Sequence, residues 1–256
     1  MKKEFYVHGT DSLIDLDKEW DLVDRDWGRR FELKHDESMA YWEIYLREDY
    51  FKGDCIIKPG DVVVDIGANV GIFTSLALDM GASRVIGYEP HKGNFELAKK
   101  NNPNAKIYNL AVSDKKDEEL ELFITVGVGG HSTIKDFCEK DSNHYKSENY
   151  FIKTTTINDI IEENFLNKID FLKIDTEGAE LLILKGLSDE NLNKISNISL
   201  EYHHMVFNYD DSVYDNLQQR FIKKGFIVFT WILDRHTRMV YISKGDVFRK
   251  NPKHSV

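Results

Sequence analysis

The chain has 256 residues, of which 41% are hydrophobic, and its 34 basic and 44 acidic residues give a formal net charge of −10. This length suits one α/β domain with an extension and would crowd two domains of ordinary size. The acidic balance argues against a general nucleic-acid binder and against a protein held on an anionic membrane. Small neutral or cationic partners are easier to accommodate.

Targeting signals are not evident in the sequence. No stretch approaches the roughly 20 apolar residues of a membrane-spanning helix, and the N-terminus lacks the apolar core of a signal peptide. The two cysteines, Cys55 and Cys138, are far apart and show no CxxC or metal-ligand spacing. We therefore expect a soluble, cytoplasmic protein without a membrane span. The sequence carries no signal for an oligomeric state.

The first 50 residues differ from the rest in their pattern. They are rich in aromatic and polar residues but show no alternation of strands and helices, and apolar periodicity over residues 37–50 predicts one helix. We expect residues 1–50 to form a helical or irregular cap, residues 51–245 a single α/β domain, and residues 246–256 a tail.

The segment VVVDIGANVGIF at residues 62–73 joins a buried strand to a glycine-containing turn. Its apolar run is typical of a parallel strand that is buried on both faces, and Gly67 and Gly71 permit a tight turn into a helix. A dinucleotide site has GxGxxG spacing, whereas this loop has GxxxG and is preceded by Asp65. That carboxylate would repel a pyrophosphate and attract an ammonium or sulfonium group. S-adenosylmethionine carries both cations and no phosphate.

Further polar residues follow the next two predicted strands. Glu89 and Pro90 come after the strand Arg84–Tyr88, about 20 residues beyond the glycine loop, which is the spacing of an acid that binds ribose hydroxyls. A third strand, at residues 106–109, leads to Asp114. Its carboxylate could accept a hydrogen bond from an adenine amino group.

An insertion at about residues 119–156 interrupts the alternation of strands and helices. Leu120, Leu122 and Ile124 alternate with polar residues as in a half-exposed strand, and a glycine-rich turn follows. We expect the insertion to border the site, with His131 and Ser132 of its GVGGHST turn as candidate substrate contacts.

Residues 169–187, IDFLKIDTEGAELLILKGL, repeat the pattern of a buried strand that ends on an acid. Asp175 and Glu177 follow the strand, and Glu180 begins a helix, where an acid stabilised by the helix dipole is the favoured interpretation. Ligands of open α/β sheets bind at the carboxyl ends of the strands. Both acid-bearing loops are therefore predicted to face one crevice.

Six motifs occur in order over residues 50–204: DVVVDIGANVGIF, GYEP, LAVSD, TTTINDI, DFLKIDTEGAE and LEYH. Together they resemble the FkbM-type S-adenosylmethionine-dependent methyltransferases. The resemblance implies an α/β class I methyltransferase fold, a Rossmann-like three-layer sandwich whose seven-stranded, mostly parallel sheet has an antiparallel last strand. It also implies O-methylation of hydroxyls on sugars, glycoconjugates or secondary metabolites.

Carried over to this sequence, the resemblance assigns residues 51–245 to the methyltransferase domain and places the ribose of S-adenosylmethionine on Glu89 and the adenine near Asp114. The cofactor leaves as S-adenosylhomocysteine. The candidate catalytic residues beside the methyl group are Asp175, Glu177, Glu201 and His203. The expected cofactor-binding residues are Asp65, Gly67, Ala68, Asn69, Gly71, Glu89, Pro90 and Asp114.

Methylation of an alcohol requires removal of its proton. His203 is a candidate general base because the ordinary pKa of histidine lies near neutrality. Asp175 could orient the histidine, orient the hydroxyl or be the base itself, and crowding could raise the pKa of Asp175 or Glu177. The acidic cluster could instead hold a divalent cation, which we do not favour because such clusters also occur without metals.

Two other functions are compatible with parts of the sequence. An NAD(P)-dependent oxidoreductase of Rossmann type predicts a third loop glycine and no preceding carboxylate, and the sequence has neither feature. A non-catalytic adenosine-binding module could lose the acids around Asp175, which this chain retains. Amino-directed nucleic-acid methyltransferases carry an Asn/Asp-Pro-Pro-aromatic signature where this chain has DTEG. We therefore expect a hydroxyl acceptor on a small molecule or glycan, and no nucleic acid.

Overall fold

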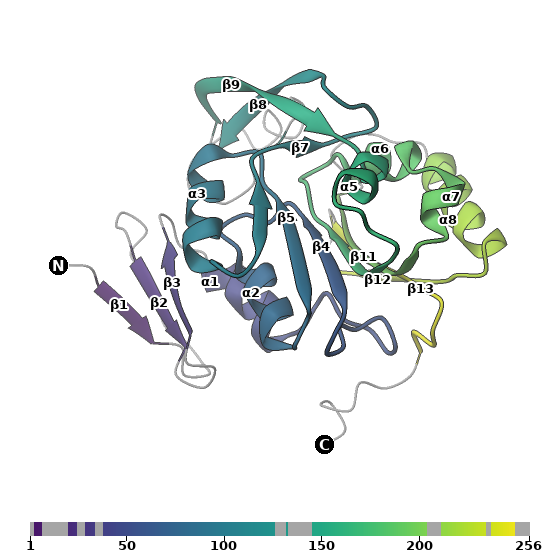
Figure 1. The fold of residues 1–256 in the computed structure, drawn as a ribbon, viewed down its shortest axis with the longest axis horizontal. Coiled ribbons are helices and arrows are strands. Elements are labelled where there is room, and N and C mark those ends of the chain that lie inside the picture. Colours follow the sequence, from purple (N-terminus) through teal and green to yellow (C-terminus); the bar gives the residue numbers. More distant parts are fainter. Residues whose placement is uncertain are drawn as a thin grey trace.

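The computed structural model describes residues 3–6, 20–24, 29–33, 38–125, 132, 145–203, 211–233 and 237–248 (Figure 1). Its strands are β1 (Lys3–Tyr6), β2 (Trp20–Asp24), β3 (Arg29–Leu33), β4 (Val62–Ile66), β5 (Arg84–Tyr88), β6 (Lys106–Tyr108), β7 (Ala111–Val112), β8 (Glu119–Thr125), β9 (Tyr145–Thr155), β10 (Ile169–Ile174), β11 (Ile195–His203), β12 (Ile227–Ile232) and β13 (Thr237–Ser243). Its helices are α1 (Ser38–Tyr41), the π-helical turn η1 (Trp42–Leu46), α2 (Ile72–Asp79), α3 (Lys92–Asn101), α5 (Ile157–Glu163), α6 (Glu180–Gly186), α7 (Asp189–Leu192) and α8 (Asp211–Lys223).

A seven-stranded sheet forms the centre of the molecule, in the order β12-β13-β11-β10-β4-β5-β6. The neighbouring pairs from β11 to β6 are parallel. The last strand, β13, lies between β11 and β12 and is antiparallel to both. The predicted α/β sheet with an antiparallel last strand is therefore confirmed.

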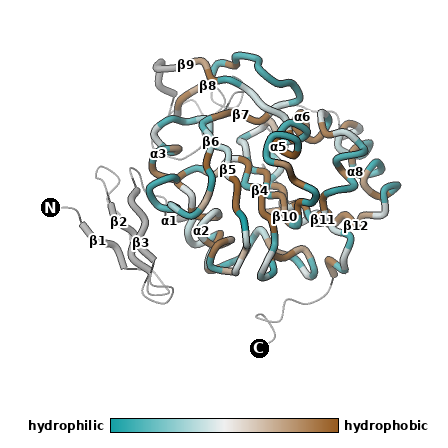
Figure 2. The backbone as a smooth tube through the Cα atoms, in the orientation of Figure 1, coloured by the Kyte–Doolittle hydropathy of each residue, from teal (hydrophilic) through white to brown (hydrophobic). Residues whose placement is uncertain are grey.

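Alternate residues of the central strands enter two different apolar clusters. Val64 and Ile174 belong to a cluster with residues of α5, α6 and α8, whereas Val63 and Phe171 belong to one with η1 and α2. Figure 2 shows these central strands as largely hydrophobic. Since successive side chains of a strand point to opposite faces, the sheet is covered on both sides and three layers result.

The N-terminal cap differs from the expected helical or irregular segment. Its strands β1, β2 and β3 form a small sheet, in which β1 is parallel and β3 antiparallel to β2. These short strands mix charged with apolar residues without regular alternation, a weak pattern whose strand character depends on pairing. The helix predicted over residues 37–50 corresponds to α1 and η1, which end at Leu46.

The insertion forms a sheet of its own, in the order β7-β9-β8. Strands β8 and β9 pair antiparallel, with a register irregularity between Leu122 and Ile124. Leu122 is buried, while Phe151 on β9 is exposed. The half-exposed strand predicted from Leu120 onward is therefore present, as β8.

The chain beyond β13 packs against the beginning of the domain. The amide of Asp246 donates to a carboxylate oxygen of Asp54 at 3.0 Å, the amide of Asp54 donates to the carbonyl of Asp246 at 3.0 Å, and Val247 is buried. We expected a tail from residue 246 onward, but the chain is still packed against the domain at Val247.

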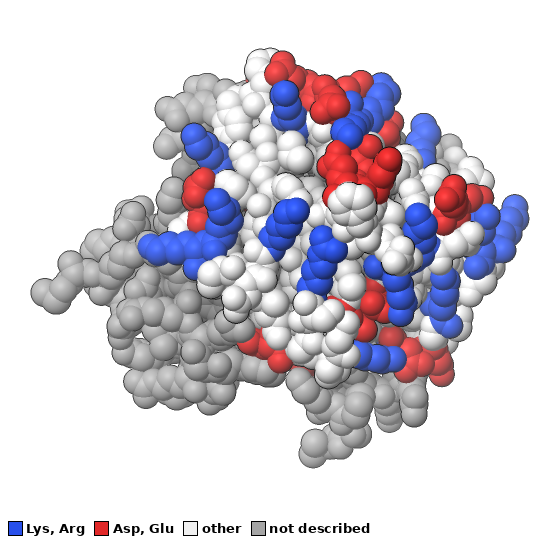
Figure 3. Space-filling model, viewed as in Figure 1, with Lys and Arg blue, Asp and Glu red and all other residues white. Residues whose placement is uncertain are grey.

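Figure 3 shows basic and acidic side chains interspersed over one face of the molecule. Within the described ranges, no helix combines the length and the apolar character needed to cross a membrane.

Candidate functional site

The glycine loop lies directly against the chain that follows β10. Gly67 has φ +77°, and a Cβ at this position would lie 1.7 Å from the carbonyl oxygen of Asp175. The amide of Asp175 donates to the carbonyl of Ile66 at 3.0 Å. Only glycine therefore allows the ends of β4 and β10 to approach this closely.

The second loop glycine has a similar role toward α3. Gly71 has φ +87°, and a Cβ there would lie 2.3 Å from Nδ2 of Asn102, which donates to the carbonyl of Gly71 at 2.9 Å. Ala68 is buried between these glycines, and its amide donates to the carbonyl of Tyr88 at 3.0 Å. Each glycine of the GxxxG loop thus permits one close contact, Gly67 with Asp175 and Gly71 with Asn102.

Glu89 is buried at the end of β5 and is held by backbone amides. Its two carboxylate oxygens accept hydrogen bonds from the amides of Asn69 at 2.8 Å and His91 at 2.7 Å. Burial raises the pKa of Glu89 to about 7. Asn69 has φ +49°, and its Oδ1 accepts from Nδ2 of Asn94 at 2.7 Å. These contacts fix the acid beside the glycine loop.

A cavity opens between the glycine loop and the two acid-bearing strand ends. Its walls combine apolar side chains, such as those of Leu110, Val112 and Leu122, with the acidic side chains of Glu89 and Glu177. The residues that line it are Ile66, Gly67, Asn69, Tyr88, Glu89, Pro90, Leu110, Ala111, Val112, Leu122, Asp175, Thr176, Glu177 and Ala179.

Four of the sequence-predicted cofactor residues, Asp65, Ala68, Gly71 and Asp114, are not among the residues that line this cavity in the described part of the chain. Asp65 is fully buried beneath the loop, where it accepts from the hydroxyl of Thr74 at 2.7 Å and lies 3.4 Å from Nζ of Lys173. Asp114 packs its Cα against Gly186 at the end of α6. The negative charge of Asp65 is thus opposed within the protein by a lysine.

Lys173 is a central residue of the site that our sequence analysis missed. Its side chain is 3% exposed, and its ammonium donates to the carbonyl of Gly67 at 2.6 Å. It lies 3.4 Å from Asp65 and 3.3 Å from Asp175. Burial disfavours the charged amine, but the surrounding carboxylates outweigh burial and raise the pKa of Lys173. The sequence did contain a signal for this role, a lysine in the middle of an apolar strand, because a buried charge needs partners.

Asp175 is held through one of its two carboxylate oxygens. Its Oδ2 accepts from the hydroxyl of Tyr50 at 2.9 Å and lies 3.3 Å from Nζ of Lys173. Burial favours the neutral acid, but the positive charges of Lys173 and His203 lower the pKa of Asp175. No hydrogen bond to Oδ1 is found among the residues that the structure describes, and Asp175 lines the cavity. An ionised carboxylate with one open oxygen results.

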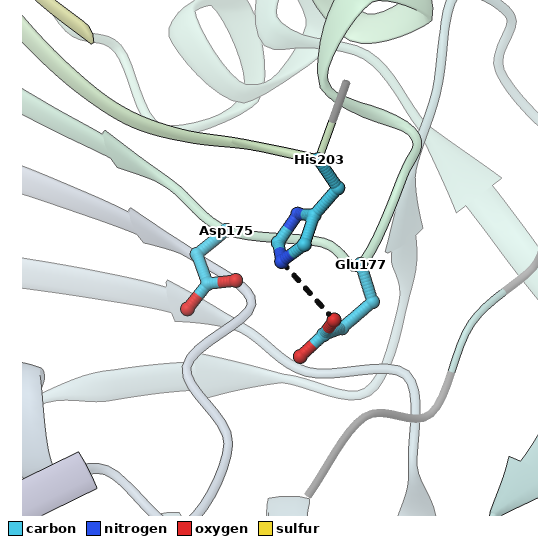
Figure 4. Close-up of side chains that lie close together, drawn as sticks. All are labelled: Asp175, Glu177 and His203. Atoms are coloured by element: carbon cyan, nitrogen blue, oxygen red, sulfur yellow. Dashed lines mark ion pairs between the residues drawn. The ribbon is translucent and has the colours of Figure 1, made fainter. Parts of the chain in front are cut away.

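His203 lies between two glutamates, one at each ring nitrogen. Nδ1 lies 3.1 Å from Glu180. Nε2 lies 3.2 Å from Glu177, and Figure 4 shows this ion pair. Burial disfavours the imidazolium, but the charges of Glu177 and Glu180 raise the pKa of His203 well above its ordinary value. The two glutamates thus favour the protonated form of the residue that we considered as a general base, in which both ring nitrogens donate.

The turn between β10 and α6 is shaped by Glu180. Its Oε1 accepts from the amides of Thr176 at 3.1 Å and Gly178 at 2.8 Å, in agreement with the structural role favoured for this acid.

Glu177, in the same turn, has φ +54°, and burial raises its pKa to about 7. The hydroxyl of Ser132 donates to the carbonyl of Glu177 at 2.7 Å, so the insertion does border the site. His131 lies outside the described residues.

The acidic cluster also has the dimensions of a cation site. Asp175, Glu177 and His203 each offer one ligand atom, and these atoms lie within 4.8 Å of one another. A metal on His203 would have to replace a ring proton that is already directed at a glutamate.

The strand order, the glycine loop that closes on β10 and the buried acid at the end of β5 define a class I S-adenosylmethionine-dependent methyltransferase. Residues 65–228 match the family described as "Methyltransferase FkbM domain". The chain belongs to the FkbM methyltransferase family.

Several known proteins are similar to this chain. The 31-O-demethyl-FK506 methyltransferase FkbM of Streptomyces tacrolimicus is 28% identical over 194 residues, which cover 65% of this chain and 74% of that protein. The AMB antimetabolite synthetase AmbE of Pseudomonas aeruginosa is 27% identical over 224 residues, and the match spans 73% of this chain but 10% of that much longer protein. The structure of the "delta-N METTL16 MTase domain" aligns with a TM-score of 0.46 and 14% identity, over 86% of this chain and 91% of that chain.

Proposed function

We propose that this protein transfers a methyl group from S-adenosylmethionine to a hydroxyl group of a neutral or cationic small molecule or glycan, with Asp175 as the proton acceptor. The observation that carries the proposal is the Asp175 carboxylate. One of its oxygens is fixed by Tyr50 and Lys173, while the residue lines the cavity beside the glycine loop.

The residues around the cavity suit the proposed cofactor. Gly67 and Asn69 would hold it along the loop, and the buried Glu89 offers a carboxylate for ribose hydroxyls. Leu110, Val112 and Leu122 give that end of the cavity apolar walls suited to an adenine ring. These features support S-adenosylmethionine over a dinucleotide, whose pyrophosphate would lie near the carboxylates.

When bound, S-adenosylmethionine supplies a methyl group that is activated by its sulfonium. Asp175 would accept a hydrogen bond from the acceptor hydroxyl at Oδ1 and take its proton as the oxygen–carbon bond forms and the methyl carbon–sulfur bond breaks, which would leave S-adenosylhomocysteine. A hydroxyl becomes strongly acidic as it is alkylated, so a carboxylate of lowered pKa suffices as the base. Positioning of the hydroxyl in line with the methyl group would supply much of the acceleration.

Glu177 and His203 would shape the opposite side of the acceptor site. The His203 imidazolium is directed at Glu177 and keeps that carboxylate facing the cluster. Glu201 lies 3.8 Å from the same ring nitrogen. The histidine would then contribute positive charge and orientation, while the proton leaves through Asp175.

The charge of the site supports an acceptor without negative charge. Carboxylates outnumber cations around the cavity, and the ammonium of Lys173 is already engaged by Asp65 and Asp175. A phosphate or carboxylate on the acceptor would meet repulsion in a poorly screened crevice. The net charge of −10 is a further reason to propose an acceptor other than nucleic acid.

The proposal is tested by incubating the full chain with isotopically labelled S-adenosylmethionine and three matched groups of hydroxylated compounds: neutral sugars and metabolites, their amino-substituted forms, and their phosphorylated forms. Mass spectrometry with fragmentation locates the transferred methyl group. We expect methyl ethers on neutral or amino-substituted compounds and little transfer to phosphorylated ones. Methylation found only on nitrogen, or only on phosphorylated compounds, would overturn the proposal.

A further inference from the structure

Tyr50 reaches the reaction centre from outside the matched family region, which begins at residue 65. It follows η1 and is 4% exposed. Its ring meets that of Phe73 edge-on, with centroids 5.3 Å apart, and the ammonium of Lys173 lies 5.4 Å from the ring centroid. The adjacent carbonyl of Asp49 accepts a hydrogen bond from the hydroxyl of Tyr241 on β13. The position of the tyrosine is therefore fixed on several sides.

The hydroxyl of Tyr50 lies between two carboxyl groups that come from different strands. It is 2.9 Å from Oδ2 of Asp175, after β10, and 2.8 Å from Oε2 of Glu201, on β11. The single hydrogen of the hydroxyl therefore faces two carboxyl groups, and the ammonium of Lys173 lies 3.3 Å from the same Oδ2 of Asp175.

The hydroxyl of Tyr50 lies at donating distance from Oε2 of Glu201 and from Oδ2 of Asp175, and it ties the two carboxyl groups to one point. With Lys173 on the same oxygen, Oδ2 is occupied from two sides. The second oxygen of Asp175 is left for the acceptor.

We propose that Tyr50 is a positioning residue for methyl transfer, which orients the carboxylate of Asp175 through the hydrogen bond of its hydroxyl to Oδ2, with Glu201 holding the same hydroxyl from β11. The inference rests on the proposed role of Asp175. It also means that the N-terminal segment completes the reaction centre of the family domain.

The test compares Tyr50→Phe with Tyr45→Phe. Both variants lose one buried tyrosine hydroxyl from the same N-terminal segment, but the hydroxyl of Tyr45 donates to Asp79, at 3.0 Å, at the end of α2. Crystal structures of both variants and of the wild type report the orientation of Asp175. Binding of S-adenosylmethionine is measured by calorimetry, and kcat and KM are measured with an acceptor found in the screen.

We expect Tyr50→Phe to turn or disorder the Asp175 carboxylate and to lower kcat by roughly ten- to a hundredfold, the usual effect of losing a hydrogen bond to a charged group. Cofactor affinity should stay close to wild type, both variants should lose a few degrees of melting temperature with their buried hydrogen bonds, and Tyr45→Phe should keep both the orientation and the rate. An unchanged Asp175 in Tyr50→Phe, or wild-type kcat, overturns the inference. If the wild type methylates no hydroxyl, the proposed function fails, and the crystal structures still decide the role of Tyr50.

Discussion

The ammonium of Lys173 donates a 2.6 Å hydrogen bond to the carbonyl of Gly67, so β10 holds the glycine loop through a buried charge. The same ammonium lies between Asp65, beneath the loop, and Asp175, beside the cavity. In the sheet, Lys173 and Asp65 are direct neighbours on β10 and β4. One lysine thus connects the shape of the cofactor loop to the orientation of the proposed proton acceptor.

Replacing Lys173 with methionine is expected to destabilise the protein by about 3–5 kcal/mol, because Asp65 would remain buried without a countercharge. The free energy of unfolding is measured by urea denaturation. Lys185→Met, at an exposed position of α6, is the control and should change it by less than about 0.5 kcal/mol. Equal stabilities of the two variants would show that the buried charge pair contributes little.

Gly67→Ala should abolish binding of S-adenosylmethionine, because the added Cβ would lie 1.7 Å from the carbonyl oxygen of Asp175. Gly60→Ala is a matched control, since Gly60 also has positive φ, at +93°, but nothing lies within 4 Å of an added Cβ. The control should lose about 1–2 kcal/mol of stability from backbone strain and still bind the cofactor. Calorimetry separates the two, and normal binding by Gly67→Ala would refute the predicted close approach.

His203→Asn should lose stability in a pH-dependent manner. A histidine whose pKa is raised by folding contributes stability that is fully present below its unfolded pKa, about 6.5, and is lost as the pH rises through the raised value. The melting-temperature difference between wild type and variant should therefore be largest near about pH 6 and shrink at alkaline pH. A difference that stays constant or grows with pH would mean that His203 is neutral in the folded protein.

Treatment with EDTA followed by gel filtration should leave the methyl-transfer rate unchanged, because both ring nitrogens of His203 already contact glutamates. Initial rates before and after treatment provide the measurement. Loss of activity that Mg²⁺ or Mn²⁺ restores would instead assign a metal centre to Asp175, Glu177 and His203.

Much of the central fold could be predicted because its strands are apolar runs bounded by turns. The predicted strand Arg84–Tyr88 coincides with β5, and the run before Gly67 is β4. The strands β2 and β3 could not be predicted in this way. Each is five residues long and mixes charged with apolar residues, so each depends on pairing with a partner that the local pattern does not reveal.

The sequence indicated which acids share a crevice more than it indicated how each acid is held. The order of motifs indicated that Asp175, Glu177 and Glu89 share a crevice, and all three line one cavity. The register between β4 and β10 decides toward which face of the sheet Asp65 points and which residue becomes its partner. Register is a tertiary property that no single segment contains.

Protonation states were likewise beyond the reach of sequence patterns. The usual pKa of histidine indicated a base at position 203, but its charge is set by Glu177 and Glu180, which the turn after β10 brings to its two ring nitrogens. Tyr50 is one of several aromatic residues in the first 50, and the local pattern does not single it out. The role that we propose for it rests on the distances from its hydroxyl to Asp175 and Glu201.

The central claim is that the Asp175 carboxylate takes the proton of an acceptor hydroxyl. Its most direct test is the single-turnover rate of methyl transfer by Asp175→Asn, compared with wild type at saturating S-adenosylmethionine and with cofactor affinity measured in parallel. We predict unchanged affinity and a rate lowered by roughly 10²–10⁴-fold, the usual contribution of a positioned base. A wild-type rate in the variant would contradict the account.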